Sequence, residues 1–103
     1  FSVKEIISPE LIRLNNDLII RLIGIKQNPA INGKATEYLT RKILGKKVFL
    51  KYDEVKRDKE NNLMVYLYLE NKTFINAHLL KEKLALVDNS IIFKYKNKFN
   101  NYQ

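Results

Sequence analysis

The eight residues Leu18-Ile19-Ile20-Arg21-Leu22-Ile23-Gly24-Ile25 are the strongest structural signal in the chain. They are mostly aliphatic and follow the turn cluster Asn15-Asn16-Asp17, which predicts a β-strand that begins after a turn. Side chains alternate across a pleated strand, so Ile20 and Leu22 share one face and Arg21 points to the other. The pattern therefore predicts a buried strand that carries an arginine on its second face.

Shorter strands and two helices surround this stretch in the sequence. Gly33–Leu44 has apolar residues at helical spacing and ends at Gly45, and Asn76 is a plausible N-cap for a second helix. Strands are expected at Val3–Ile7, Leu11–Leu14, Lys47–Asp53 (with Val48, Leu50 and Tyr52 inward), Leu63–Leu69, Thr73–Ile75 and Leu86–Val87. This order suits a small, closed or partly closed barrel with helices packed on it, as in oligonucleotide-binding barrels. We predict an α+β protein, mainly β, with a five-stranded OB-fold barrel and two or three helices.

The composition limits the kinds of site that the chain can build. Its 103 residues have room for one domain, and the absence of Cys removes disulfides, thiolate metal sites and cysteine nucleophiles. A single His78 cannot build a zinc site, and the apolar runs are too short to span a bilayer. No signal sequence precedes Phe1, so we expect a cytoplasmic domain cut from a longer protein, with no membrane partner.

The charge balance favours a polyanionic partner. Nineteen Lys and Arg against eleven Asp and Glu give a net charge of +8, which favours nucleic acid over an acidic protein. Codon bias of an AT-rich genome is the alternative explanation, because Lys, Asn and Ile are abundant. Residues 1–88 form the expected domain. Residues 89–103 form a basic polar tail with alternating Lys94, Lys96 and Lys98, expected as a linker or a frayed end.

Three ordered segments carry a family resemblance. They are Arg21-Leu22-Ile23-Gly24-Ile25, Arg57-Asp58-Lys59 leading into Leu63–Leu69, and Phe74-Ile75-Asn76-Ala77-His78-Leu79-Leu80 closing with Leu84-Ala85. Together they resemble the staphylococcal-nuclease-like (thermonuclease) family. The resemblance implies an OB-type barrel and, in active members, a calcium-dependent phosphodiesterase whose site lies beside the third strand.

The family's active-site positions fall on altered residues in this chain. They are Ser8, Glu10, Arg21, Lys26, Pro29 (or Asn28, if the loop slips by one) and Asn62. The resemblance implies aspartates as calcium ligands, but here Glu10 is the one carboxylate left and Lys26 occupies the other ligand position. Neither Pro29 nor Asn28 acts as a base, and the second arginine is replaced by Asn62. We therefore expect no catalytic residues, no bound metal and no cofactor.

Several residues allow two interpretations. Arg21 has either a functional role, contact with phosphate, or a structural one, a bond to Glu10 or to a loop carbonyl. Lys26 is a second candidate partner of Glu10. Tyr66 and Tyr68 stack on bases or, as we favour, pack under a helix. A replacement active site from Asp53, Glu54, Asp58 and Glu60 is less expected than a solvated loop, and His78 is expected as an exposed helical residue. Lys83 replaces a family glycine, where a left-handed cap would cost about 1 kcal/mol.

A narrower resemblance suggests the setting. Arg21–Pro29, Phe49–Asp53 with Asn61-Asn62-Leu63, and Thr73–Leu79 look like nuclease-like domains appended to DNA modification methylases. The leading hypothesis is a catalytically inactive module that binds DNA, or docks, as an accessory to a methylase. Arg21, Lys26, Arg57 and Lys59 are the expected DNA contacts, and the rest of the parent polypeptide is the second partner. An active calcium-dependent nuclease and a protein-interaction domain without nucleic-acid binding remain alternatives.

Overall fold

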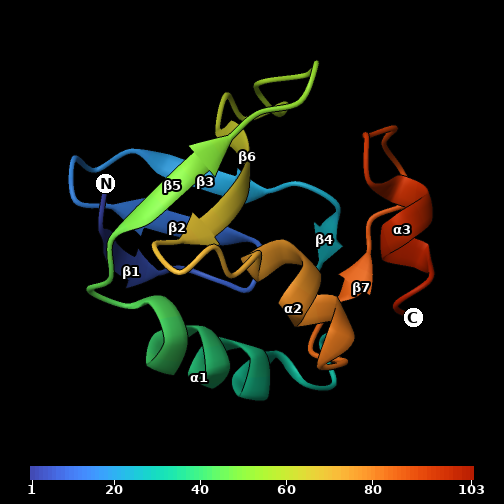
Figure 1. Ribbon diagram of the computed structural model, residues 1–103, viewed down its shortest axis with the longest axis horizontal. Coiled ribbons are helices and arrows are strands. Elements are labelled where there is room, and N and C mark those ends of the chain that lie inside the picture. Colours follow the sequence, from blue (N-terminus) through green and yellow to red (C-terminus); the bar gives the residue numbers. More distant parts are fainter.

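The computed structural model describes residues 1–103 as seven strands and three helices (Figure 1). In chain order they are β1 (Val3–Ile6), β2 (Leu11–Leu14), β3 (Ile19–Leu22), β4 (Ile25–Lys26), α1 (Asn32–Ile43), β5 (Val48–Lys51), β6 (Leu63–Leu69), α2 (Ile75–Lys81), β7 (Leu86–Val87) and α3 (Lys96–Asn100). The expected mainly-β α+β class is confirmed. None of the helices has the length and apolar character needed to cross a bilayer.

Five strands form one mixed sheet in the order β1-β2-β3-β6-β5. β3 runs parallel to β6, with Arg21 opposite Met64, and the other neighbours are antiparallel. The edge strands meet only through isolated bridges, such as that between Ser2 and Lys47. The architecture is consistent with the predicted OB fold, and of the two predicted forms the closed barrel is absent, because the sheet is not closed. A continuous ladder between β1 and β5 is missing.

The predicted strand Leu18–Ile25 is interrupted at Gly24. Gly24 has a φ of +78°, a left-handed conformation that an L side chain adopts only with strain, and it turns the chain out of the sheet. The residues beyond it form β4, which pairs with β7 in a separate two-stranded sheet. Ile20 and Leu22 are buried and Arg21 is half-buried, as the alternation predicted.

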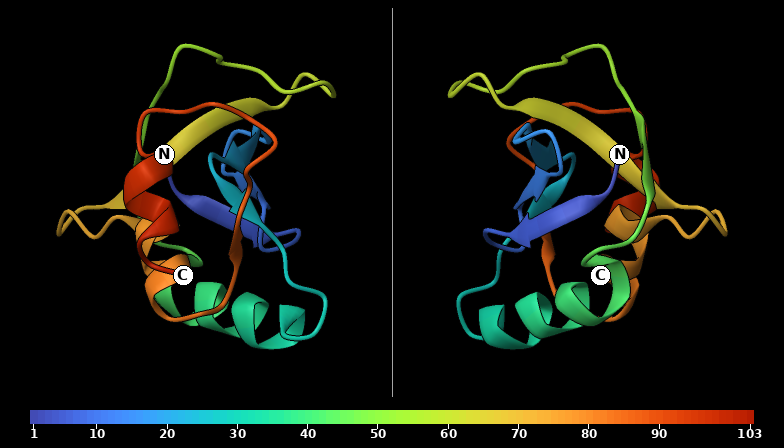
Figure 2. Two further views of the ribbon diagram at one scale, coloured as in Figure 1. Left: turned by 90° about the vertical axis from the view of Figure 1, so that its right-hand side faces the viewer. Right: turned by 90° about the vertical axis from the view of Figure 1, so that its left-hand side faces the viewer.

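The two longer helices cover the core from one side. α1 buries Ala35, Leu39 and Ile43, as its spacing predicted, and lies below the sheet in Figures 1 and 2. α2 packs between this helix and β6. Of the side chains expected to point inward from β5, Val48 is buried and Leu50 half-buried. Tyr52 lies beyond the end of the strand and is exposed, so that prediction was wrong.

Asn76 joins α2 to the strands. The helix begins at Ile75, so the prediction of Asn76 as its N-cap was wrong. Its fully buried side chain accepts a hydrogen bond from the Leu67 N–H (2.9 Å) and donates to the carbonyls of Ile23 (2.9 Å) and Val65 (3.2 Å). This amide satisfies buried backbone groups at the place where β3 ends and the ladder to β6 stops.

Residues 89–103 fold back onto the molecule, although we expected a polar tail there. Phe93 and Phe99 belong to the hydrophobic core, and α3 lies beside β7 at the right of Figure 1. A Cβ placed on Gly24 would come within 2.6 Å of the Phe93 ring and 2.9 Å of the Phe99 ring. The glycine therefore provides both the turn after β3 and the space for these two rings.

Candidate functional site

Arg21 lies between two carboxylates from distant parts of the chain. Its Nη1 donates to Glu10 Oε1 at 2.6 Å, and its Nε donates to Asp58 Oδ2 at 2.6 Å. The side chains of Arg21, Glu10 and Asp58 are 24%, 19% and 11% exposed, so these pairs are shielded from bulk water. We call these three residues the Arg21 cluster. The ion pair with Glu10, one of the two expected roles of Arg21, is present.

The turn between β1 and β2 positions Glu10. The hydroxyl of Ser8 accepts hydrogen bonds from the N–H groups of Glu10 and Leu11, both at 3.2 Å, and so shapes the turn. The second carboxylate oxygen of Glu10 accepts the Gln27 N–H at 2.7 Å. Both oxygens of Glu10 are therefore occupied by partners within the chain.

The loop between β5 and β6 positions Asp58. Oδ1 accepts the Asn62 N–H at 2.8 Å and Oδ2 accepts the Asn62 side-chain amide at 3.2 Å, across a turn in which Asn61 has a φ of +66°. Burial by itself raises the pKa of Asp58, but the hydrogen bonds from Arg21 and Asn62 outweigh it and hold that pKa below its ordinary value. Asp58 is therefore ionised at neutral pH.

The same contacts act on Arg21. Burial lowers its pKa, whereas the hydrogen bonds and charges of Asp58 and Glu10 raise it, and the net effect is a raised pKa. The cluster contains one positive and two negative side chains. A phosphate that approached Arg21 would have to compete with two carboxylates already in place.

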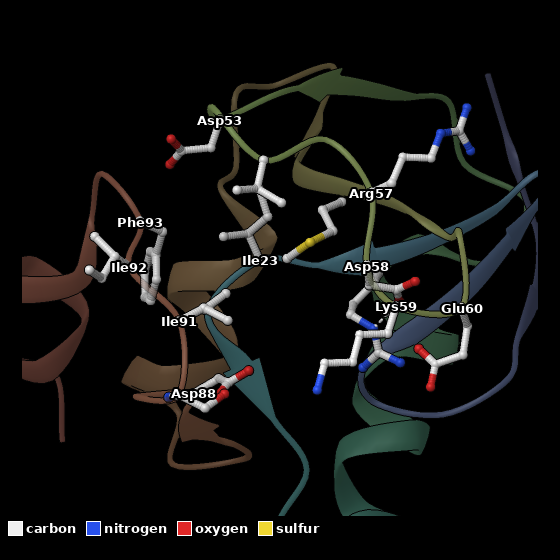
Figure 3. A pocket seen from close by; sticks show the side chains of 14 residues that line it. Ile23, Asp53, Arg57, Asp58, Lys59, Glu60, Asp88, Ile91, Ile92 and Phe93 are labelled. Carbon is white, nitrogen blue, oxygen red and sulfur yellow. Dashed lines mark hydrogen bonds and ion pairs between the residues drawn. The ribbon is translucent and has the colours of Figure 1, made fainter.

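A cavity of about 690 Å³ opens beside the cluster (Figure 3). One wall is formed by Ile91, Ile92 and Phe93, the other by Asp58, Lys59 and Glu60, and Ile23 lies between them. Three cationic and four carboxylate side chains line the cavity: Arg21, Arg57 and Lys59, and Asp53, Asp58, Glu60 and Asp88. Its charges nearly cancel, so it is not a basic surface.

The structure does not bring all the predicted DNA contacts together. Lys26 is exposed at a smaller hollow that it shares with Glu10 and Asp88, and no ion pair within 4.0 Å joins Lys26 to Glu10. Arg57 is exposed, donates to the Asn61 carbonyl at 3.1 Å and extends away from the cavity in Figure 3. Of the four, Arg21, Arg57 and Lys59 line the cavity and Lys26 does not.

The comparison with family models decides the family of this fold and site. Residues 4–103, nearly the whole chain, match the model described as staphylococcal nuclease homologue. The chain belongs to the staphylococcal nuclease homologue family. A comparison with curated proteins finds no match.

The remaining family positions of this staphylococcal nuclease homologue serve the local backbone. Pro29 is exposed in the loop before α1, where Asn28 Oδ1 accepts the Ala30 N–H at 3.2 Å. Asn62 binds Asp58, as described above. Neither position places a carboxylate or a guanidinium toward Arg21.

The acidic residues considered for a replacement active site do not form one group. Asp53 Oδ1 accepts the Glu54 N–H at 2.7 Å, and Oδ2 accepts the Lys94 N–H at 2.8 Å and the Tyr66 hydroxyl. Burial raises the pKa of Asp53, but these hydrogen bonds outweigh it and lower it overall. Glu54 and Glu60 are exposed. No three His, Asp or Glu side chains are grouped as metal ligands would be.

Tyr66 and Tyr68 pack in the interior, the role that we favoured for them. Tyr66 is buried and meets Phe74 and Tyr95 edge-on, with ring centroids 5.8 and 5.0 Å apart. Tyr68 is half-buried and stacks on Phe74 at 4.5 Å. Neither ring is a free platform for a nucleobase.

Two further predictions concern α2 and the residue at which its C-terminal turn ends. His78 is half-buried on α2 rather than exposed. Lys83 has a φ of +59°, so the helix does end with a left-handed residue where the family usually has glycine.

Sequence reasoning missed Asp58 as the second partner of Arg21. It lies 37 residues away in a loop of mixed charge, which is typical of a solvated turn. The spacing Asp58-x-x-x-Asn62 directly before β6 is the signal that could have identified it. An Asp whose side chain bonds across a turn is held in one orientation by that turn. Since β6 pairs in parallel with β3, that turn lies beside Arg21.

Proposed function

We propose that this staphylococcal nuclease homologue does not cleave phosphodiester bonds and serves as an accessory DNA-binding or docking module of a DNA modification methylase. The observation that carries the proposal is the Arg21 cluster. The arginine that the family resemblance assigns to phosphate is held by Glu10 and Asp58 of its own chain.

The donor set argues against the calcium ion that the family resemblance implies. Calcium takes six to eight oxygen ligands, usually including several carboxylates. Both oxygens of Glu10 are engaged by Arg21 and Gln27, and the ammonium group of Lys26 stands at the other family position. These residues do not fit a calcium ion, so we derive no catalytic step through one.

The loss of several groups together supports the same conclusion. Hydrolysis needs a base for the attacking water and cations for the developing negative charge, and these groups act as a set. Pro29 carries no base, and the amide of Asn62 carries no charge and binds Asp58. Restoring one group would leave the others missing.

The DNA-binding part of the proposal rests on charge, and the methylase part rests on resemblance. A net charge of +8 attracts nucleic-acid backbones, which supply most non-specific affinity. Lys26, Arg57 and Lys59 are exposed and have no carboxylate partner within 4.0 Å. The segments around Arg21, Phe49 and Phe74 suggest the methylase context.

The first prediction concerns cleavage. We expect that the purified domain leaves single-stranded and duplex DNA intact in calcium, and that adding a chelator changes nothing. Gel electrophoresis of end-labelled DNA measures this, with an active staphylococcal nuclease as the positive control. Cleavage that calcium supports and the chelator abolishes would overturn the proposal.

One observation favours protein docking as a second candidate function. The cavity beside the Arg21 cluster exposes Ile92 (90% exposed) and Val55 (60% exposed) at its rim, although charged residues are common around it. Exposed apolar groups at a cavity are typical of a surface that receives an apolar side chain. If the domain binds no DNA at about 50 mM salt, DNA binding is rejected and protein docking becomes the proposed function.

A further inference from the structure

Four basic side chains gather at a place unrelated to the Arg21 cluster. Arg41 and Lys42 lie in the last turn of α1, and Lys46 and Lys47 lie between α1 and β5. They line one shallow hollow of about 400 Å³ together with Leu69, the last residue of β6, and with Glu70 and Asn71 from the turn after it. We call the four cations and this turn the basic hollow.

The charges of the basic hollow are largely uncompensated. Glu70 is the one carboxylate among its lining residues. Lys42, Lys46 and Lys47 have no ion pair within 4.0 Å. Arg41 has one with Glu37, but it is long, at 3.9 Å, and both side chains are mostly exposed. An exposed pair of this kind contributes little and leaves the guanidinium available.

A role in the local structure explains only two of these four cations. Arg41 and Lys42 stand at the negative end of the α1 dipole, where cations stabilise a helix. Lys46 and Lys47 lie past the helix, and the hydrogen bonds around them are made by backbone, such as the Val3 N–H to the Lys46 carbonyl at 3.1 Å. Their ammonium groups form no ion pair, and Lys47 Nζ lies over the exposed Phe49 ring, 5.7 Å from its centre.

The basic hollow and the cavity differ in charge and in place. The hollow has four cations and one carboxylate, whereas the cavity beside Arg21 has three cations and four carboxylates. In Figure 1 the turn from α1 into β5 lies at the left edge, and the β5–β6 loop that lines the cavity lies at the top. The hollow therefore has an excess of positive charge that the cavity beside Arg21 lacks.

We propose that the basic hollow provides the main contacts to the phosphate backbone of duplex DNA. This inference rests on the proposed DNA-binding function and gives it a location. Lysine ammonium groups bind phosphates as point charges, without the geometry that base recognition needs. Phe1, Phe49 and Tyr52 are exposed on or beside β5, but none of them lines the basic hollow, and Lys47 Nζ already lies 5.7 Å from the centre of the Phe49 ring. The hollow therefore offers cations and no row of rings on which unpaired bases would stack. Duplex binding through phosphates fits these residues.

The test compares two double variants that lose equal charge. Lys46→Gln/Lys47→Gln alters the basic hollow, and Lys26→Gln/Lys59→Gln alters the surroundings of the Arg21 cluster; all four lysines are exposed. Affinity for a labelled duplex is measured by fluorescence anisotropy over a range of salt concentrations, and circular dichroism checks folding. We expect Lys46→Gln/Lys47→Gln to reduce the log-log salt slope by about two and to weaken binding at low salt by about tenfold or more. Lys26→Gln/Lys59→Gln tests the competing location that the family resemblance indicates, and we expect it to change both quantities much less.

Each outcome has a separate meaning. No binding of the unaltered domain at low salt would reject DNA binding itself. Binding that only Lys26→Gln/Lys59→Gln weakens would overturn the inference and leave the proposed function standing. Equal losses in both variants would also overturn it, because they would show a response to net charge without a preferred surface.

Discussion

Arg21 remains charged at a half-buried position because Glu10 and Asp58 lie against it. Removing one partner from such a pair leaves a charge with incomplete compensation, which is strongly unfavourable in a shielded place. The sequence indicated Glu10 as a partner because both residues belong to one family motif set. Asp58 depends on the parallel pairing of β3 with β6, which no local pattern reveals.

The depressed pKa of Asp58 makes stability depend on acid. In the unfolded chain an Asp has a pKa of about 3.9, and in the folded protein the pKa of Asp58 is lower. The unfolded state therefore takes up the proton first as the pH falls. The stability that Asp58 contributes is fully present above about pH 4 and is lost as the pH falls through its folded pKa.

Asp58→Asn tests this dependence. We expect the variant to unfold more easily at neutral pH and to lose less stability than the unaltered protein when the pH is lowered from about 6 to about 3. Urea unfolding at each pH measures the free energy of unfolding. Asp53, whose pKa is also depressed, contributes to the acid response of both proteins and so cancels in the comparison. Parallel pH profiles would contradict the assignment.

At the scale of elements, the end of α2 carries measurable strain. Lys83 has a φ of +59°, where a side chain costs about 1 kcal/mol relative to glycine. We expect Lys83→Gly to stabilise the protein by about 0.5–1 kcal/mol in urea unfolding, since the loss of backbone strain exceeds the gain in unfolded-state entropy.

Lys83→Ala is the matched control for that substitution. It also removes the hydrogen bond from the Lys83 ammonium to the Tyr102 carbonyl, but it keeps the Cβ. It should therefore be no more stable than the unaltered protein. A gain as large as that of Lys83→Gly would point to the ammonium group rather than to the backbone.

Periodicity predicted most elements but not where they break. The apolar spacing of α1 is a local property, and Ala35, Leu39 and Ile43 are buried as expected. The break at Gly24 depends on Phe93 and Phe99, and the role of Asn76 depends on carbonyls of two strands. An Asn near a helix start is typical of a cap, so a buried amide that joins strands has the same local appearance.

At the scale of the whole molecule, the carboxyl-terminal segment completes the core. Phe99 is fully buried and packs against Phe74, Phe93 and Tyr95. We expect Phe99→Ala to destabilise the protein by about 3–5 kcal/mol, because it leaves a cavity among rings that cannot close over it. Thermal unfolding measures the loss.

Ile92→Ala provides the control within the same segment. Ile92 is 90% exposed, so its truncation should change stability little. Equal effects of the two substitutions would mean that the segment does not pack as described. The sequence does not indicate this packing. Lys and Asn separate Phe93, Tyr95, Phe99 and Tyr102, and such a composition is typical of a solvated segment.

The sequence predicts the net charge but not where on the surface the charged side chains gather. The total of +8 is read directly from composition, but its location depends on which loops the fold brings together. Lys47 is predicted as the first residue of the strand Lys47–Asp53, and no local pattern distinguishes Lys46. They become neighbours of Asn71 only because β5 and β6 are antiparallel and place the two turns at one end.

Phe93 and Phe99 fill the space beside Gly24, so the core is completed late during synthesis. The strands emerge from the ribosome first, yet the rings that cover the end of β3 come from a segment that is synthesised after all seven strands. A nascent chain that pauses before Phe99 would present uncovered apolar surface to chaperones and proteases.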